Sequence, residues 1–311
     1  MEETEPAEGR PTIQVVDTTK VYGDSTVVDG LSFSVFPRVV TGFLGPNGAG
    51  KSTTMKMILG LVQATRGEAL VCGRPIREIS NPSRVMGSLI DPQAMEPNRT
   101  AKQHLMWIAR MSGLGADAVS EKLETVGLTA AADKQVGGYS LGMKQRLALA
   151  ASLIGDPQIL MLDEPINGLD ADGIVWMRNL LRSLAAEGRT VFLSSHLMSE
   201  MELTADRAII INRGRLVEDV LVSELTSRAA GRRVLVGSVD QRRLKDELVG
   251  AGGTVAEEGD SLVVHGLEAP AIGQLAFDRG IPLTELHSEH QTLEEAFRGM
   301  TSHEGESEVR P

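Results

Sequence analysis

A glycine-rich run stands near the start of the chain, where "GPNGAGKS" fills residues 45–52. An apolar strand, "RVVTGFLG", is expected before it and a helix, "KSTTMKMILGLV", after it. Glycines let the backbone curl so that several N–H groups point inward, and the first turn of a helix adds partial positive charge. Lys51 adds a point charge, and the hydroxyl of Ser52 could bind Mg²⁺. The run therefore predicts a site for the phosphates of a nucleotide.

A pair of carboxylates follows a second apolar strand, in "ILMLDEP". Mg²⁺ on a nucleotide needs a carboxylate at the end of a neighbouring strand, and Asp163 has that position. Glu164, the next residue, is placed to polarise an attacking water as a general base. His196 ends the strand "TVFLSSH" and could contact the terminal phosphate from the side. These residues together indicate chemistry on a magnesium nucleotide.

Composition narrows the class of protein. The 311 residues are 41% hydrophobic and 23% charged, as in an ordinary globular protein. The net charge of −11 argues against broad electrostatic binding to nucleic acid. A single cysteine, Cys72, excludes a disulfide within the chain and fits a reducing compartment. No segment approaches the roughly 20 apolar residues that span a bilayer, so the chain is not expected to cross a membrane alone.

The order of expected elements predicts an α/β fold. Residues 1–11 are expected to be a disordered lead-in, and two paired strands, "TIQVVDTTKVYG" and "TVVDGLSFSVFP", follow. Three helical stretches fill about 95–155. Strands then alternate with helices, including "RAIIINRGRLV" as one strand, which implies a parallel sheet covered on both faces. The main domain is expected to span residues 12–227.

A different pattern begins at residue 228. Strands and helices are expected in the order β-α-β-β-α-β, with a hairpin at Gly259-Asp260 and a last helix in "TLEEAFRGM". This order matches a ferredoxin-like α+β unit over 228–300. A polar, disordered tail is expected at 301–311. The unit lacks a nucleophile–base pair or the spacing of metal ligands, so its default role is structural or dimer-stabilising.

These motifs, in this order, resemble the nucleotide-binding subunit of ATP-binding cassette (ABC) transporters. "GPNGAGKST" looks like the Walker A loop, "ILMLDEP" like Walker B, "YSLGMKQR" like the signature, "NGLD" like the D-loop and "SSH" like the switch histidine. The resemblance implies a P-loop NTPase cassette with a RecA-like parallel core sheet, an N-terminal antiparallel β part and an α-helical subdomain. It also implies ATP and Mg²⁺ as cofactors.

The resemblance assigns site residues by motif. Glu164 and His196 are the expected catalytic residues, and Ser52, Asp91 and Asp163 the expected metal ligands. The residues expected to bind nucleotide are Tyr22, as the adenine-stacking aromatic, with Gly45, Asn47, Gly48, Gly50, Lys51, Ser52, Thr53, Ser140, Gly142 and Asp170.

The resemblance also implies partners. Ser140 can cap the helix "LGMKQRLALAA", whose N–H groups would then face an anion. In this family that helix end faces the ATP of a second cassette, so a head-to-tail homodimer with two buried ATP molecules is expected. Closure of the dimer on ATP would power a separate membrane permease, which places the chain as a peripheral subunit on the cytoplasmic face of a bacterial membrane. No nucleic acid partner is expected.

Two departures from the common family pattern indicate which branch of the ABC transporter family the sequence resembles. Leu141 and Met143 replace the more common Gly and Gln of the signature, while Ser140 and Gly142 remain. Asp91 stands where many members have the Q-loop glutamine. These variant motif residues, and the sequence "LEEAF" near the end of the chain, resemble those of bacterial exporters of drugs, antibiotics or peptides.

Two alternatives outside transport stay open at this stage. A soluble ABC ATPase acting on DNA or ribosomes would need a long coiled coil between the Walker motifs or a second cassette, and the sequence shows neither. A nucleotide-sensing module without appreciable turnover is suggested by Asp91 and Met143, whereas Glu164 and His196 argue against it.

Overall fold

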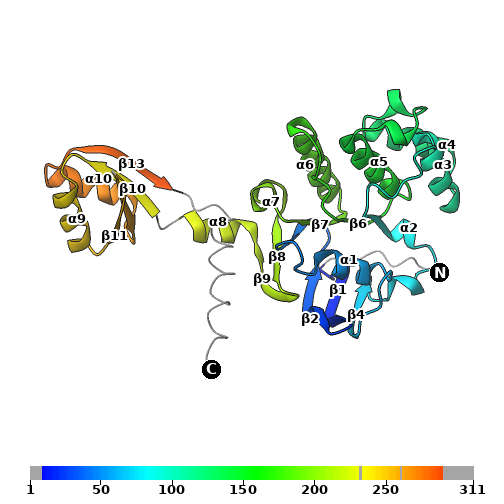
Figure 1. Cartoon of the computed structure of the whole chain (residues 1–311), viewed down its shortest axis with the longest axis horizontal. Coiled ribbons are helices and arrows are strands. Elements are labelled where there is room, and N and C mark those ends of the chain that lie inside the picture. The colour runs from blue at the N-terminus through cyan, green and yellow to red at the C-terminus, as the bar shows by residue number, and fades with distance from the viewer. Residues whose placement is uncertain (1–8, 231–232, 260, 290–311) are drawn as a thin grey trace. The chain divides into compact units, whose positions relative to one another are not determined.

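The computed structural model describes residues 9–230, 233–259 and 261–289, and the chain divides after Leu221 into two compact units. Figure 1 labels the helices and strands of each unit. The expected lead-in, as far as residue 8, lies outside the described residues. So do the last helix, in "TLEEAFRGM", and the tail at 301–311.

A three-stranded antiparallel sheet opens the first unit, as predicted. Its strands are β1 (Ile13–Tyr22), β2 (Ser25–Val35) and β4 (Arg66–Val71), in the order β2-β1-β4. Apolar side chains of β1 and β2, among them Ile13, Val15 and Val35, are buried beneath it. The sheet packs this apolar face toward the core of the unit.

The central sheet has six strands in the order β5-β6-β7-β3-β8-β9. They are β5 (Met86–Leu89), β6 (Ile159–Leu162), β7 (Thr190–Ser195), β3 (Val40–Leu44), β8 (Arg207–Asn212) and β9 (Arg215–Leu221). Every neighbouring pair is parallel except β8 and β9. The parallel sheet expected from alternating strands and helices is present, with an antiparallel strand at one edge.

Two expected elements were wrong in extent. The segment "RAIIINRGRLV" is a hairpin and not one strand, because Arg213 and Gly214 adopt φ angles of 48° and 79° and reverse the chain. The helix after the glycine loop, α1 (Lys51–Ile58), ends before Val62, because Gly60 takes a left-handed φ of 67°.

Three phenylalanines join the two sheets. Phe33 of β2, Phe43 of β3 and Phe192 of β7 are buried, with ring centroids 5.3–5.8 Å apart. Rings at such distances and tilts attract one another beyond the area they bury. This cluster fixes β3, and with it the loop that follows β3, against both sheets.

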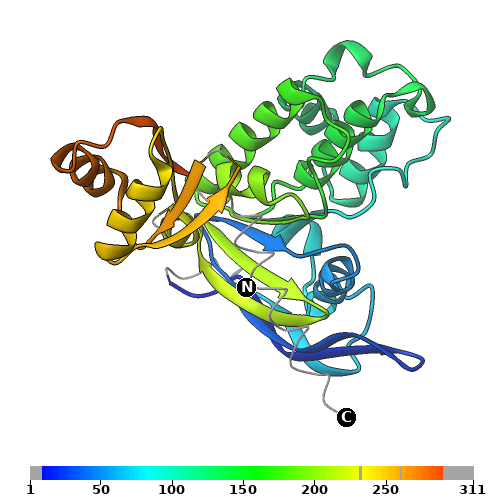
Figure 2. The ribbon, with the colours of Figure 1, turned by 60° about the vertical axis from the view of Figure 1, so that its left-hand side comes forward.

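Helices complete the first unit. The central sheet is accompanied by α1, α6 (Ala171–Ala186) and α7 (Met198–Thr204), and the short α2 (Pro82–Val85) precedes β5. Three further helices pack on one another: α3 (Ala101–Met111), α4 (Ala116–Thr125) and α5 (Leu141–Leu153). Figure 2 shows this group away from the antiparallel sheet (blue). Single 3₁₀ turns lie at Ile76–Glu78, Thr129–Ala131 and Val136–Gly138.

The second unit has the ferredoxin-like order. After α8 (Val222–Ala230) come β10 (Arg233–Ser238), α9 (Gln241–Gly250), β11 (Thr254–Glu258), β12 (Ser261–His265), α10 (Ala269–Asp278) and β13 (Leu283–Glu289). The strands pair antiparallel in the order β11-β12-β10-β13. Buried Val236, Leu244 and Ile272 help form its separate core.

No helix of the described segments is long and apolar enough to cross a bilayer.

Helix α5 approaches the central sheet backbone to backbone. A Cβ atom placed on Gly87 of β5 would lie 1.9 Å from the carbonyl oxygen of Ser152 on α5. One placed on Gly155, just after α5, would lie 2.2 Å from the carbonyl oxygen of Ser83. Only glycine leaves room for main chains this close. The carboxyl end of α5 is therefore held tightly against the edge of the sheet.

We expect Gly87→Ala to lower the free energy of unfolding by about 3 kcal/mol, because the backbone of α5 must move to admit a methyl group. Urea titration followed by tryptophan fluorescence measures this, since both tryptophans, Trp107 and Trp176, lie in the first unit. Gly138→Ala is the control. Its new Cβ would meet open space, so its midpoint should hardly change. Equal midpoints for the two variants would contradict the close approach.

Candidate functional site

The glycine loop connects β3 to α1 and is shaped by close contacts. Gly48 and Gly50 have φ angles of 83° and 102°, which side chains rarely adopt. A Cβ on Gly50 would lie 2.8 Å from the carbonyl oxygen of Val27, and one on Gly45 would lie 2.5 Å from that of Ile211. The neighbouring strands therefore leave no room for side chains at Gly45 and Gly50, and the main chain of the loop lines the site.

Lys51 begins α1 and turns its side chain back over the loop. The side chain is only 6% exposed, and its Nζ donates to the carbonyl oxygens of Gly45 at 2.6 Å and Pro46 at 3.3 Å. Burial lowers the pKa of Lys51, while the negative charges of Glu164 and Asp163 act in the opposite direction. The ammonium group is thus largely desolvated, and its attraction to an anion is stronger than in water.

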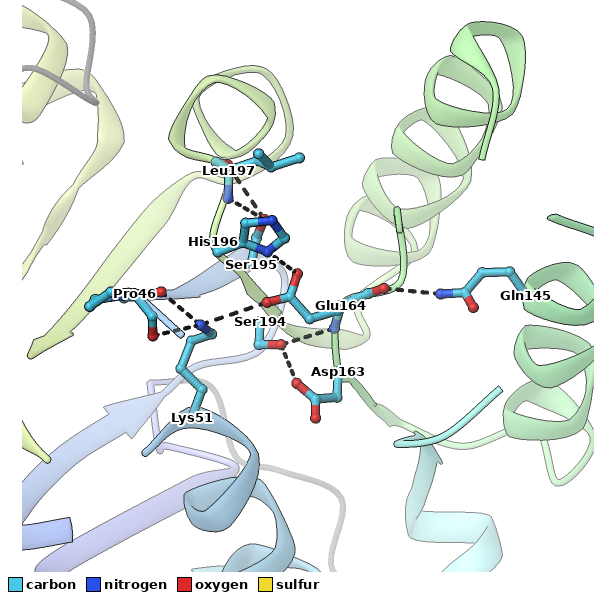
Figure 3. A network of polar contacts seen from close by, with 10 residues as sticks. Pro46, Lys51, Gln145, Asp163, Glu164, Ser194, Ser195, His196 and Leu197 are labelled. Atoms are coloured by element: carbon cyan, nitrogen blue, oxygen red, sulfur yellow. Dashed lines mark hydrogen bonds and ion pairs between the residues drawn. The ribbon is translucent and has the colours of Figure 1, made fainter. Parts of the chain in front are cut away.

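Asp163 directly follows β6 and is 7% exposed. The hydroxyl of Ser194, on the neighbouring β7, donates a short hydrogen bond to Asp163 Oδ1. The same hydroxyl accepts from the backbone N–H of Glu164 at 2.9 Å. Ser194 therefore holds two consecutive residues at the end of β6 (Figure 3).

Glu164 connects the groups expected to act on the nucleotide. Its Oε1 lies 3.7 Å from Lys51 Nζ, and its Oε2 lies 2.9 Å from His196 Nδ1. A carboxylate accepts only, so Nδ1 carries the proton in this bond and Nε2 lies on the other side of the ring. Glu164 adopts a left-handed φ of 49°. Figure 3 shows the carboxylate between the lysine and the histidine, so the structure brings these three predicted residues together.

Two of the three donors expected for Mg²⁺, Asp163 and Ser52, suit that ion. Asp163 keeps one carboxylate oxygen beyond the one bonded to Ser194, and Ser52 is exposed in the first turn of α1. Groups of three or more acidic, histidine or cysteine residues suited to a metal are absent from the described residues. Mg²⁺ is usually bound through one or two protein ligands, phosphate oxygens and water, so a two-donor site fits.

The signature residues begin α5. Ser140 caps the helix by accepting from the backbone N–H of Met143 at 3.2 Å, as its position predicted. Leu141 lies so close to Gly168 that a Cβ on that glycine would meet its Cδ2 at 2.1 Å. A Cβ placed on Gly142 would meet the carbonyl oxygen of Gly168 and Leu169 Cδ2 at 3.5 Å, an ordinary contact distance. The signature turn thus packs on the D-loop of its own chain.

Five other predicted residues are placed as follows. Asp170 caps α6 by accepting from the N–H of Gly173, and Asp91 Oδ1 accepts from the N–H of Gln93 within its own turn. Tyr22 is 48% exposed at the β1–β2 turn, with Lys20 Nζ 4.7 Å from its ring centroid. Asn47 is exposed in the loop, and Thr53 is half-buried in α1.

Two residues of the site were missed by sequence reasoning. Ser194 would have been found from the β6–β7 register, which pairs Leu162 with Leu193 and so sets Ser194 beside Asp163. Gln145 is 1% exposed, and its Nε2 donates to the carbonyl oxygen of Glu164 at 3.0 Å. Its signals in the sequence were its place in the motif "YSLGMKQR" and an amide among the buried, mostly apolar residues of α5.

Comparison with known proteins identifies relatives of both parts of the chain. A family model described as "ABC transporter" matches residues 28–167, and one for a domain of unknown function matches residues 232–294. The bacitracin transport ATP-binding protein BcrA of Bacillus licheniformis is 42% identical over 219 residues, which cover 70% of this chain and 72% of that protein. The Nod factor export ATP-binding protein I of Burkholderia orbicola is 36% identical over 295 residues, covering 92% and 95%.

The fold has a counterpart among solved structures. An ATP-binding subunit of an ABC transporter superposes with a TM-score of 0.64 at 24% identity, over 70% of this chain and 92% of that one. This confirms the cassette fold that the motifs predicted. From its motifs, its fold and its relatives, the chain belongs to the ATP-binding proteins of ABC transporters.

Proposed function

We propose that this ATP-binding subunit hydrolyses ATP and that Glu164 is the general base. The observation that carries the proposal is the placement of its carboxylate between Lys51 Nζ and His196 Nδ1. Lys51 binds the β- and γ-phosphates, together with the N–H groups of the loop and the start of α1. Glu164 therefore lies beside the group that holds the phosphate to be cleaved.

The reaction needs one proton transfer. Glu164 accepts a proton from a water that attacks the γ-phosphorus, and the products are ADP and inorganic phosphate. His196, held by its Nδ1–H bond to Glu164, orients that carboxylate, and its Nε2 would contact the γ-phosphate. Ser52 and Asp163 would hold Mg²⁺, which would supply charge neutralisation.

The second half of each site would come from another copy of the chain. Ser140 and the N–H groups of the first turn of α5 form a capped helix end that suits an anion. Lys51 and Ser140 would then contact the same nucleotide from opposite protomers. ATP binding would close this head-to-tail dimer, and loss of the γ-phosphate would release it.

The relatives support a role in export. BcrA is named for bacitracin transport and the Burkholderia protein for Nod factor export, and the latter match covers both domains of this chain. We therefore propose that the chain drives a separate membrane permease that exports a drug, antibiotic or peptide. It would act at the cytoplasmic face of the membrane. The soluble and sensing alternatives are not favoured by these relatives.

Glu164→Gln should lower the turnover of Mg-ATP by about 100-fold or more, because an amide cannot accept the proton of water. Phosphate release by the purified protein, alone and with its permease in liposomes, measures this. Glu124→Gln, an exposed change on α4, is the control and should leave turnover unchanged. Full activity of Glu164→Gln would exclude Glu164 as the base.

Ser194→Ala should slow hydrolysis and lower the free energy of unfolding by about 1–3 kcal/mol. The change removes a donor to Asp163 and leaves the buried N–H of Glu164 without its acceptor. Ser194→Thr retains the hydroxyl and tests whether this group alone matters. If Ser194→Ala equals the parent in phosphate release and in urea midpoint, the bridging role is wrong.

Lys51→Ala and Ser140→Arg should complement each other when mixed. Each variant alone has no intact site, whereas a mixed head-to-tail dimer has one site with an unchanged Lys51 and an unchanged Ser140. Co-expressed, differently tagged variants purified through both tags should regain close to half the parent turnover per dimer. Activity that stays at the level of the single variants would argue against a site shared between protomers.

A further inference from the structure

Gln145 is a buried amide whose presence stability does not explain. Its neighbours along α5, from Leu147 to Ala150, are apolar and buried. Its Nε2 donates to the carbonyl oxygen of Glu164, but no described residue bonds to its buried Oε1. A buried acceptor without a partner costs free energy, and an apolar side chain of the same size would avoid that cost.

The orientation of the amide follows from its partner. A carbonyl oxygen only accepts hydrogen bonds, so the amide nitrogen and not the amide oxygen must face Glu164. Turning the amide over would satisfy Oε1 no better and would set two acceptors against each other. Gln145 thus acts on Glu164 as a single directed donor.

Glu164 needs such a donor because its backbone is strained. A left-handed φ in a residue other than glycine persists only where the surroundings hold it. The N–H of Glu164 donates to Ser194 Oγ, and its C=O accepts from Gln145 Nε2. Figure 3 shows these two bonds reaching the residue from β7 and from α5.

The face of α5 that carries Gln145 also contacts the residues that follow Glu164, at Gly168 and Leu169. Gln145 lies four residues after Leu141 and three after Gly142, so the three share one side of the helix. Leu141 and Gly142 pack on Gly168 and Leu169. A shift of the end of α5 that carries Ser140 would therefore reach Glu164 through Gln145.

We propose that Gln145 is a positioning residue. It holds the backbone carbonyl of Glu164, so the position of the Glu164 carboxylate depends on the position of α5. The proposal rests on the hydrolytic role of Glu164. It assigns no contact between Gln145 and the nucleotide. Its effect should thus fall on the rate of hydrolysis and not on nucleotide affinity.

Gln145→Met tests this, because methionine keeps the length and bulk of the side chain but cannot donate. We expect kcat for Mg-ATP to fall about tenfold or more, since small displacements of catalytic groups are costly. The dissociation constant for a fluorescent ATP analogue should stay within about twofold. Gln158→Met, an exposed change just before β6, is the control and should match the parent throughout.

Hydrogen exchange of the free protein gives a second readout that needs no activity. Gln145→Met should speed amide exchange at residues 164–169, and Gln158→Met should not. An unchanged kcat, or a loss seen only in nucleotide affinity, would overturn the positioning role. If the parent itself shows no turnover, even with its permease, the hydrolytic proposal fails. Exchange at residues 164–169 then decides the role of Gln145, and unchanged exchange rejects it.

Discussion

The register among three parallel strands is the constraint on which the site depends. β7 lies between β6 and β3, pairing Leu193 with Leu162 on one side and Ser195 with Leu44 on the other. The carboxyl ends of all three strands therefore meet at one edge of the sheet. Because Ser194 and His196 come from the middle strand, they can contact the residues that follow β6 while standing beside the loop that follows β3.

At this edge of the sheet, the cost of burying the charge of Lys51 is opposed by the negative charges of Glu164 and Asp163. Lys51 is buried, and burial alone would favour its neutral form. The carboxylates of Glu164 and Asp163 oppose that loss, and two loop carbonyls accept hydrogen bonds from the ammonium group. The lysine thus keeps a partnered charge although its side chain is buried. A triphosphate would offer a stronger set of acceptors to the same group, which leaves Glu164 available to a water molecule.

Sequence reasoning identified the loops of the site because glycines and apolar strands mark them. Gly45 to Ser52 and Ile159 to Glu164 needed only local patterns, and the structure joins Lys51, Glu164 and His196 directly. The antiparallel sheet and the ferredoxin-like unit were also predictable, because alternation and element order are local. The strand order was not, and without it Ser194 remained one serine of an apolar strand. The hairpin at Arg213 was missed because an arginine gives no signal for a left-handed turn.

Helix α5 connects the signature residue Ser140 to the end of β6, where Glu164 lies. Its carboxyl end is fixed to the sheet, where Gly87 allows Ser152 to approach, so the helix has little freedom to slide there. Its amino end carries Ser140, and one turn later Gln145 holds the carbonyl of Glu164. A helix is stiff over such a length, so contact at Ser140 and the placement of Glu164 are mechanically related. If a second protomer supplies that contact, its engagement would act on Glu164 through α5 and Gln145.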